Sequence, residues 1–216
     1  MIKYKFKKAI IWDWNGTLLN DIDICIRCMN QLLKRRNLPV LTIEKYRKIF
    51  TFPVKPYYQC AGFNFEKEPF ELPALEFIDL YHQALGRAKL FSDVMQALEF
   101  ISSKGISQSV LSAMEHESLV KSLTDQKIFP FFEEVSGINN HYAHSKLEIG
   151  QQLIEKINLP KNQLLMIGDS LHDLEVSDQL GIDCLLVSRG HQSKERLLAK
   201  TPNVIDELND VISLFN

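Results

Sequence analysis

Short apolar runs alternate with amphipathic stretches through the second half of the chain, and this alternation limits the fold more than any other feature. The runs have the length of buried strands, and the stretches between them carry apolar residues at helical spacing. The expected strands are 106–111, 133–136, 163–167, 184–187 and 204–205, and the expected helices are 93–103, 115–126, 146–157, 171–180 and 208–215. Strands joined by helices predict a parallel sheet that is covered on both faces. We therefore expect an α/β fold with a three-layer, Rossmann-like core.

A further strand is expected near the start of the chain, at residues 8–12, and a long helical block follows it. Helical spacing is present over 22–36, after Thr42, after Pro53 and over 69–87, with no strand signal between them. The first strand is therefore expected to join the later sheet, with the helical block inserted after it. This reading divides the chain into a core domain of residues 1–19 and 88–216 and a helical cap domain of residues 20–87.

Charge and composition narrow the classes of partner. The 216 residues are 45% hydrophobic and 24% charged, and the formal net charge is −2. A charge this small creates no overall field that would attract nucleic acid or an anionic membrane. The basic start "KYKFKK" precedes an apolar run that is too short for a signal peptide or a membrane helix. We expect a cytoplasmic protein, monomeric or homodimeric, with neither nucleic acid nor membrane as a partner.

Polar side chains stand where several of the expected strands end. Asp13 follows the first strand in "AIIWDWNGTLL", Ser112 follows "SVL", and Asp169 follows "LLMI" within "GDS". Lys146 opens a helix after a loop. Ligands bind beyond the carboxyl ends of the strands in sheets of this kind. The sequence therefore predicts that these side chains converge.

The predicted convergence suits phosphoryl chemistry. Two carboxylates at neighbouring strand ends form a site for a hard cation such as Mg2+, and Asp173, one helical turn after Asp169, could hold its water shell. Lys146 and donors near Ser112 suit anionic oxygens. The metal and the lysine would screen a phosphate from Asp13, so that Asp13 could attack phosphorus and form an aspartyl-phosphate.

The same residues carry a resemblance to a known family. The segments "DWNGT", "LSA", Lys146 and "GDSLHD" resemble, in order and spacing, the four motifs of the haloacid dehalogenase superfamily. The helical block resembles the small α-helical cap of that superfamily. The stretch "LFSDVMQALEFISSKGISQSVLSA" is similar to the segment between cap and second motif in phosphoglycolate-phosphatase-like members. The resemblance implies a hydrolase that acts on a small phosphorylated metabolite with Mg2+ as cofactor.

The resemblance also implies roles for individual residues. Asp13 corresponds to the catalytic nucleophile and a metal ligand, and the backbone carbonyl of Asn15 to a second ligand. Asp169 corresponds to a direct ligand, and Asp173 to a residue that holds the metal's water shell. Ser112 and Lys146 correspond to the phosphate-binding residues, and the Thr17 hydroxyl supports the turn. The family often has a proline after its lysine, and "KLEIG" lacks one.

Asn15 departs from the pattern of the family's phosphatases, which usually have a second Asp at this position as the general acid and base. An amide cannot exchange a proton at neutral pH, and such help is typically worth about 100- to 10,000-fold. Four hypotheses follow: a slow phosphatase, or one with a good leaving group; an acid from the cap, with His82, Tyr57 or Tyr58 as candidates; a haloacid dehalogenase- or phosphonatase-like hydrolase; or a catalytically impaired phosphometabolite-binding protein. The phosphonatase version needs a Schiff-base lysine, for which Lys55 is the candidate. The acids of "GDSLHD" favour the phosphoryl site.

Other residues of the cap and core have two readings each. Arg47, Lys55, Tyr57 and Tyr58 could form the cap's substrate-facing surface and set specificity, or an ordinary solvated helix face with tyrosines beneath. A further set is assigned to packing or to surface loops rather than to metal binding: Cys25 and Cys28, whose spacing places both on one helix face, and His141 and His144.

Overall fold

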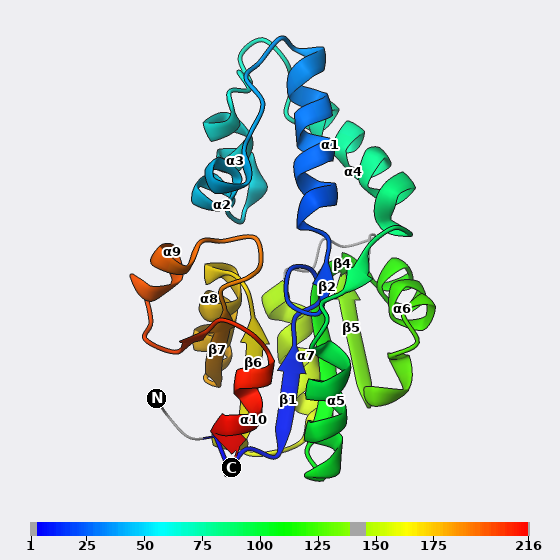
Figure 1. Ribbon diagram of the computed structural model, residues 1–216, viewed down its shortest axis with the longest axis vertical. Coiled ribbons are helices and arrows are strands. Elements are labelled where there is room, and N and C mark those ends of the chain that lie inside the picture. The colour runs from blue at the N-terminus through cyan, green and yellow to red at the C-terminus, as the bar shows by residue number, and fades with distance from the viewer. Residues whose placement is uncertain (1–3, 139–145, 216) are drawn as a thin grey trace.

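The computed structural model describes residues 4–138 and 146–215. A parallel sheet of six strands, in the order β5-β4-β1-β6-β7-β8, forms the centre of the molecule. Figure 1 shows this sheet in the lower part of the view, with a group of helices above the carboxyl ends of its strands. The sheet strands are β1 (Ala9–Trp12), β4 (Ser107–Glu115), β5 (Glu134–Ile138), β6 (Leu164–Gly168), β7 (Asp183–Val187) and β8 (Val204–Ile205).

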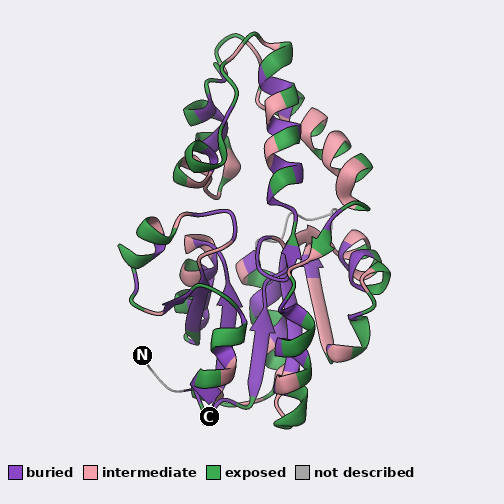
Figure 2. Cartoon of the chain, viewed as in Figure 1, coloured by how far each residue is buried: buried purple, intermediate pink, exposed green. Residues whose placement is uncertain are grey.

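Helices cover both faces of the sheet. Those of the core are α5 (Val94–Ser103), α6 (His116–Asp125), α7 (Lys146–Ile157), α8 (Leu171–Leu180), α9 (Lys194–Leu198) and α10 (Asn209–Phe215), and short 3-10 turns occupy Phe129–Phe131 and Lys161–Gln163. The side chains of β1 alternate between the faces because successive strand residues point in opposite directions. Ile10 and Trp12 pack into the cluster that contains α5 and α10, whereas Ala9 and Ile11 pack against α7 and α8. Figure 2 shows the buried strands between the outer helices. The predicted three-layer α/β core is confirmed.

The upper group of helices lies between two very short strands. It consists of α1 (Ile22–Arg35), α2 (Ile43–Ile49), α3 (Val54–Ala61) and α4 (Glu71–Leu85). The strands β2 (Leu19–Asn20) and β3 (Lys89–Leu90) pair antiparallel where the chain leaves and re-enters the core. The expectation of no strand within 20–87 is therefore wrong at Asn20. We call residues 20–87 the cap and keep this division as a proposal.

Several local signals act as the sequence analysis expects. Thr42 caps α2 by accepting a hydrogen bond from the Lys45 backbone N–H at 3.2 Å. Gly181 ends α8 with a positive φ of 72°. Other elements differ from expectation: β4 continues to Glu115, beyond the predicted end at residue 111, β5 continues to Ile138, and β2, β3 and α9 were not predicted.

Candidate active site

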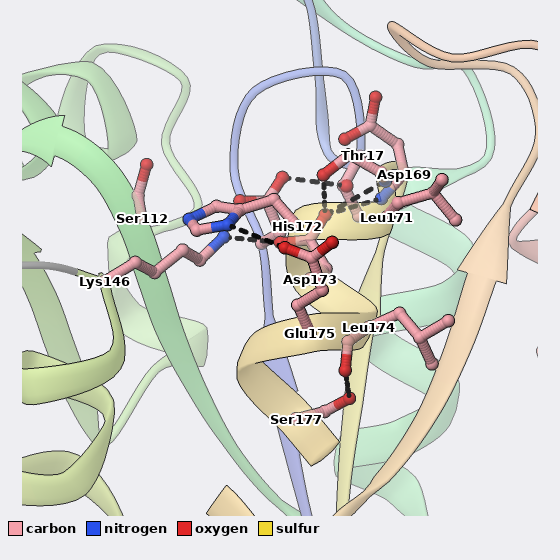
Figure 3. Close-up of polar contacts among 12 residues, drawn as sticks. Thr17, Ser112, Lys146, Asp169, Leu171, His172, Asp173, Leu174, Glu175 and Ser177 are labelled. Atoms are coloured by element: carbon pink, nitrogen blue, oxygen red, sulfur yellow. Dashed lines mark hydrogen bonds and ion pairs between the residues drawn. The ribbon is translucent and has the colours of Figure 1, made fainter. Parts of the chain in front are cut away.

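The carboxyl ends of neighbouring strands bring the predicted side chains together. Asp13 follows β1, the acids of "GDSLHD" follow β6, and β1 pairs directly with β6. Lys146, the first residue of α7, contacts Asp13 and Asp173: its Nζ lies 2.5 Å from Asp13 Oδ1 and 2.6 Å from Asp173 Oδ1. Figure 3 shows Lys146 directed at Asp173, with Ser112 on the other side of the lysine. All of these residues, with Asp169, line one cavity of about 710 Å³ between the cap and the sheet edge.

Asp13 is a buried carboxylate held from two sides. Thr17 Oγ1 donates to its Oδ2 at 2.9 Å, while Lys146 donates to its Oδ1. Burial raises the pKa of Asp13 to about 6, and the charge of Lys146 opposes that rise. The pKa of Lys146 itself is raised, because its two acidic neighbours outweigh its burial. A positioned, largely ionised carboxylate beside an ammonium group suits nucleophilic attack on an anionic substrate.

Asp173 performs a structural task as well as an electrostatic one. Its Oδ2 accepts a hydrogen bond from the Ser170 backbone N–H at 3.0 Å, which belongs to the capping box of α8, and a second one from Ser170 Oγ at 2.7 Å. Its Oδ1 accepts from Lys146. Although burial favours the neutral acid, Lys146 and Ser170 hold the pKa of Asp173 below its usual value. The first turn of α8 therefore keeps this carboxylate fixed and ionised.

Asp169 lies in a space that only glycine backbone leaves open. A Cβ atom on Gly16 would stand 2.4 Å from Asp169 Oδ2, and one on Gly190 would stand 2.0 Å from it. Gly16 also has a φ of 74°, in the left-handed region. The backbone N–H of His191 donates to Asp169 Oδ2 at 2.5 Å. Burial, together with the charges of Asp13 and Asp173, raises the pKa of Asp169 to about 8.

The acid cluster fits a hard divalent cation. Oxygen atoms of Asp13, Asp169 and Asp173 lie within 4.8 Å of one another, and all three residues are buried. One ammonium group does not balance three buried carboxylates, and the charges of Asp13 and Asp173 add to the rise that burial causes in the pKa of Asp169. Oxygen ligands suit Mg2+. Asp13 and Asp169 would hold the ion directly, with the carbonyl of Asn15 and Asp173 in the roles that the resemblance implies.

Asn15 belongs to a hydrogen-bond network that the sequence analysis missed. Its Nδ2 donates to Asp21 Oδ2 at 2.9 Å and to the Tyr81 hydroxyl at 2.7 Å. That hydroxyl donates to Asp21 Oδ2 at 2.7 Å, and Asp21 Oδ1 lies 3.2 Å from His191 Nε2. His191 Nδ1 in turn lies 2.7 Å from the Tyr46 hydroxyl. Although burial opposes it, Asp21 raises the pKa of His191 to about 9. An acid just before a predicted helix reads as an ordinary cap, so only the fold reveals this cluster.

The four predicted specificity residues of the cap separate into two pairs. Tyr57 and Tyr58 line the cavity. Arg47 donates instead to the backbone carbonyls of Gly190 at 2.9 Å and Arg189 at 2.6 Å. Lys55 lies outside the cavity lining, with its Nζ 5.7 Å from the Phe65 ring centroid. Arg47 and Lys55 are thus engaged away from the cavity lining, and a role in specificity for these two residues stays a prediction.

The remaining candidates fall in different places. His82 lines the cavity as an exposed side chain, and His172 lines it with its ring stacked on Phe52. Cys25 and Cys28 are free and buried in the packing of α1, as expected. His141 and His144 lie outside the described residues.

The chain belongs to the haloacid dehalogenase-like hydrolase family, whose model matches residues 10–187. It is a hydrolase, and the family resemblance predicted from the four motifs is confirmed. In this part of the chain lie Asp13, Ser112, Lys146, Asp169 and Asp173.

Individual relatives agree with this family. "Probable phosphatase IndB" from Dickeya dadantii is 23% identical over 213 residues, which cover 95% of this chain and 92% of the relative. A phosphoglycolate phosphatase from Pseudomonas savastanoi is 20% identical over 216 residues, which cover 96% of this chain and 79% of the relative. Among solved structures, the haloacid dehalogenase-like family protein SP0104 from Streptococcus pneumoniae superposes with a TM-score of 0.83 at 20% identity, covering 98% of this chain and 99% of that one. In the described ranges, no helix is long and apolar enough to span a membrane.

Proposed function

We propose that this protein is a Mg2+-dependent phosphatase that hydrolyses a small phosphorylated metabolite through a phosphorylated Asp13. The arrangement that carries the proposal is the buried cluster of Asp13, Asp169 and Asp173 with Lys146 bound to two of its members. Mg2+, when bound, would neutralise charge on the phosphate and on the acids around it. Both sequence relatives described above are named as phosphatases, which also supports the proposal.

The chain's own residues divide the reaction into two steps. Asp13 Oδ attacks phosphorus, so that a bond from Asp13 to phosphorus forms as the bond to the leaving oxygen breaks. The leaving oxygen keeps the electron pair and takes a proton from solvent. Water then attacks the same phosphorus and releases inorganic phosphate with a free Asp13 carboxylate. Lys146 holds a phosphate oxygen in both steps, and Thr17 keeps Asp13 oriented.

The competing enzymatic hypotheses lose support from the geometry. A phosphonatase-like reaction needs an amine in the cap to form a Schiff base, and Lys55 is turned towards Phe65 and Phe70 outside the cavity. A haloacid dehalogenase needs one nucleophilic carboxylate and no metal, whereas Asp13, Asp169 and Asp173 form a three-acid cluster. The phosphometabolite-binding hypothesis remains an outcome of the experiment below.

The proposal is tested by phosphate release from a panel of small phosphate esters and acyl phosphates. We expect release that requires Mg2+ and is lost, by at least about a thousandfold, in Asp13→Asn. Acid-quenched samples should carry a phosphoryl group on the peptide that contains Asp13. Asp125→Asn is the matched control, because Asp125 lies on the surface in an exposed ion pair with Lys121. Ligand and Mg2+ binding without any phosphate release would instead indicate a binding protein.

A further inference from the structure

The cavity above Asp13 has two chemically different walls. The sheet edge supplies the charged wall, with Asp13, Lys146 and the acids of α8. The cap supplies the opposite wall from α3, α4 and the segment between α2 and α3. That wall is aromatic and aliphatic, and its members include Phe50, Phe52, Val54, Tyr58, Phe77 and Ile78. The phosphate of a substrate must lie at the charged wall, so its leaving group must lie against the cap.

The cap wall offers no lysine or arginine to a second anionic group. Among the residues that the structure describes, Lys146 is the only lysine or arginine in the cavity lining, and Asp13 and Asp173 already bind it. The His191 ring also lines the cavity, and its two nitrogens are already paired with Asp21 and Tyr46. The nearby cations of the cap, Arg47 and Lys55, are engaged outside the cavity. Glu115 also lines the cavity, although its carboxylate accepts hydrogen bonds from the backbone N–H groups of Glu117 and Ser118 at the start of α6. A carboxylate or a second phosphate on the leaving group would therefore be buried without a partner, which is costly.

Apolar side chains in the same wall are left exposed in the protein alone. Leu75 and Ile78 on α4 are 60% and 46% exposed although both are large hydrophobic residues. Phe52 stacks on His172 at a centroid distance of 5.0 Å and extends this surface across the cavity. The Tyr57 hydroxyl is buried and has no hydrogen-bond partner within the described chain. An apolar, ring-shaped leaving group would cover the side chains of Leu75, Ile78 and Phe52.

The chemistry at Asn15 points independently in the same direction. The side-chain amide donates to Asp21 and Tyr81 and cannot protonate a leaving oxygen. A leaving group that departs as a stable anion needs the least help. A phenol has a pKa of about 10, whereas an aliphatic alcohol resembles water at about 16. A phenolate can therefore leave without a proton from the enzyme, and an alkoxide cannot.

We propose that the substrate is an aryl phosphate, a phosphate monoester whose leaving group is an uncharged aromatic alcohol, rather than a phosphorylated carboxylic acid or a diphosphate. This inference rests on the proposed phosphatase function. Asp13 displaces the phenolate, which leaves with the electron pair of the phosphorus–oxygen bond and takes its proton from water. The ring lies between Phe52 and the Ile78 face of α4.

Binding of non-hydrolysable analogues tests the pocket without turnover. Phenylphosphonate and phosphonoacetate carry the same phosphonate group, and only the second adds a carboxylate. With Mg2+ present, we expect phenylphosphonate to bind at least about tenfold more tightly in calorimetric titrations. Ile78→Lys places a cation in the cap wall and should narrow or reverse this preference. Leu72→Lys is the matched control, because Leu72 is 52% exposed on the same helix and does not line the cavity.

Turnover separates failure of this inference from failure of the proposed function. We expect kcat/KM for phenyl phosphate to exceed that for phosphoglycolate by about a hundredfold, and substituted phenyl phosphates to react faster as the leaving-group pKa falls. The aryl phosphate proposal would be overturned if the protein hydrolysed phosphoglycolate as well as phenyl phosphate and bound phosphonoacetate as tightly as phenylphosphonate. That result would leave the proposed phosphatase function supported. No hydrolysis of any ester, with the phenylphosphonate preference present, would support the aromatic pocket and reject the phosphatase.

Discussion

The side chain of Asn15 completes a buried network that a carboxylate would disturb. Its amide donates 2.9 Å to Asp21 Oδ2, so an acid at this position would set two carboxylates face to face unless one of them held a proton. The amide is thus matched to Asp21, and the usual acid of related phosphatases is not. Activity and stability should therefore respond in opposite directions to the same substitution.

Asn15→Asp should raise hydrolysis of alkyl phosphates by about a hundredfold, because a shared proton gives the leaving oxygen an acid. Aryl phosphates should change much less. The variant should also lose about 1 to 3 kcal/mol of unfolding free energy at pH 8, because the amide's hydrogen bond to Asp21 is gone. Much of that loss should return near pH 5, where one carboxyl is protonated. Asn15→Ala loses the same bond without adding an acid, so a gain on alkyl phosphates in that variant would contradict the explanation.

The acid cluster predicts a pH-dependent response to Mg2+. Folding raises the pKa of Asp13 to about 6 and that of Asp169 to about 8, so the folded protein binds more protons than the unfolded chain between about pH 4 and 8. Without a divalent cation, stability should therefore fall as the pH rises through this window. Mg2+ at about 100 times its Kd should restore about 2.7 kcal/mol at pH 8, or roughly 5 to 10 °C in Tm, and less at pH 5.5.

Thermal unfolding with and without Mg2+ at the two pH values measures this response. Asp169→Asn should remove most of the Mg2+ effect, because it removes an expected ligand and a charge together. Asp125→Asn changes an exposed residue and should leave the Mg2+ effect on Tm unchanged. An equal Mg2+ shift at both pH values would show that the ion binds away from the cluster.

The loop between β7 and α9 forms hydrogen bonds both to the cap and to Asp169 at the carboxyl edge of the sheet. Arg47 donates to two backbone carbonyls of this loop, and Gln192 Nε2 donates back to the Phe50 carbonyl at 3.1 Å. The same loop donates the His191 N–H to Asp169. Figure 1 shows the loop, in orange, directly below α2. Cap position and the orientation of an expected metal ligand are therefore linked through one short segment.

Arg47→Ala should weaken Mg2+ and phosphate binding together, by about 5- to 20-fold, because the loop that orients Asp169 loses two hydrogen bonds. Titration with Mg2+ and with inorganic phosphate measures both affinities. Lys48→Ala changes an exposed cation of the same helix and should have no effect. A loss confined to substrates with an anionic leaving group would instead mean that Arg47 contacts the substrate, as the sequence first suggested.

The sequence predicted the elements with strong periodicity and missed those made by tertiary contacts. The helix Leu171–Leu180 begins and ends as predicted, between the N-cap Ser170 and the C-cap Gly181, and the helix that contains Lys146 ends at Ile157 as predicted, shortly before Pro160. Strands β2 and β3 have only two residues each, too few for an alternation signal.

The candidate active site likewise contains residues that the sequence predicts and residues that only tertiary contacts bring together. Residues at strand ends could be placed from the sequence, whereas Asp21, Tyr81 and His191 meet only because the cap folds onto the loop after β7. The contacts of Arg47 could not be predicted for a related reason: its partners are backbone carbonyls, which no side-chain pattern reveals.

Across the whole molecule, the cap and core are packed as one unit despite their different architectures. One large hydrophobic cluster, the core cluster, contains Trp12 and Trp14, and a second, the cap cluster, contains Met29 and Tyr46. Helix α1 contributes Ile24 and Cys28 to the core cluster and Met29 to the cap cluster. Phe77 and Tyr81 of α4 pack against both clusters. Because α1 contributes to both clusters and Phe77 and Tyr81 contact both, destabilising the cap should also destabilise the sheet.

Met29→Ala tests this coupling. The side chain is fully buried in the cap cluster, and its removal should cost about 2 to 5 kcal/mol. Both tryptophans of the chain, Trp12 and Trp14, lie in the core cluster, so their fluorescence reports on the core alone. We expect the fluorescence and far-UV circular dichroism transitions to shift to lower temperature together, because the clusters share α1 and α4. Lys34→Ala, an exposed change on the same helix, should leave both in place. An early loss of helical signal with unshifted tryptophan fluorescence would mean that the cap unfolds independently of the sheet.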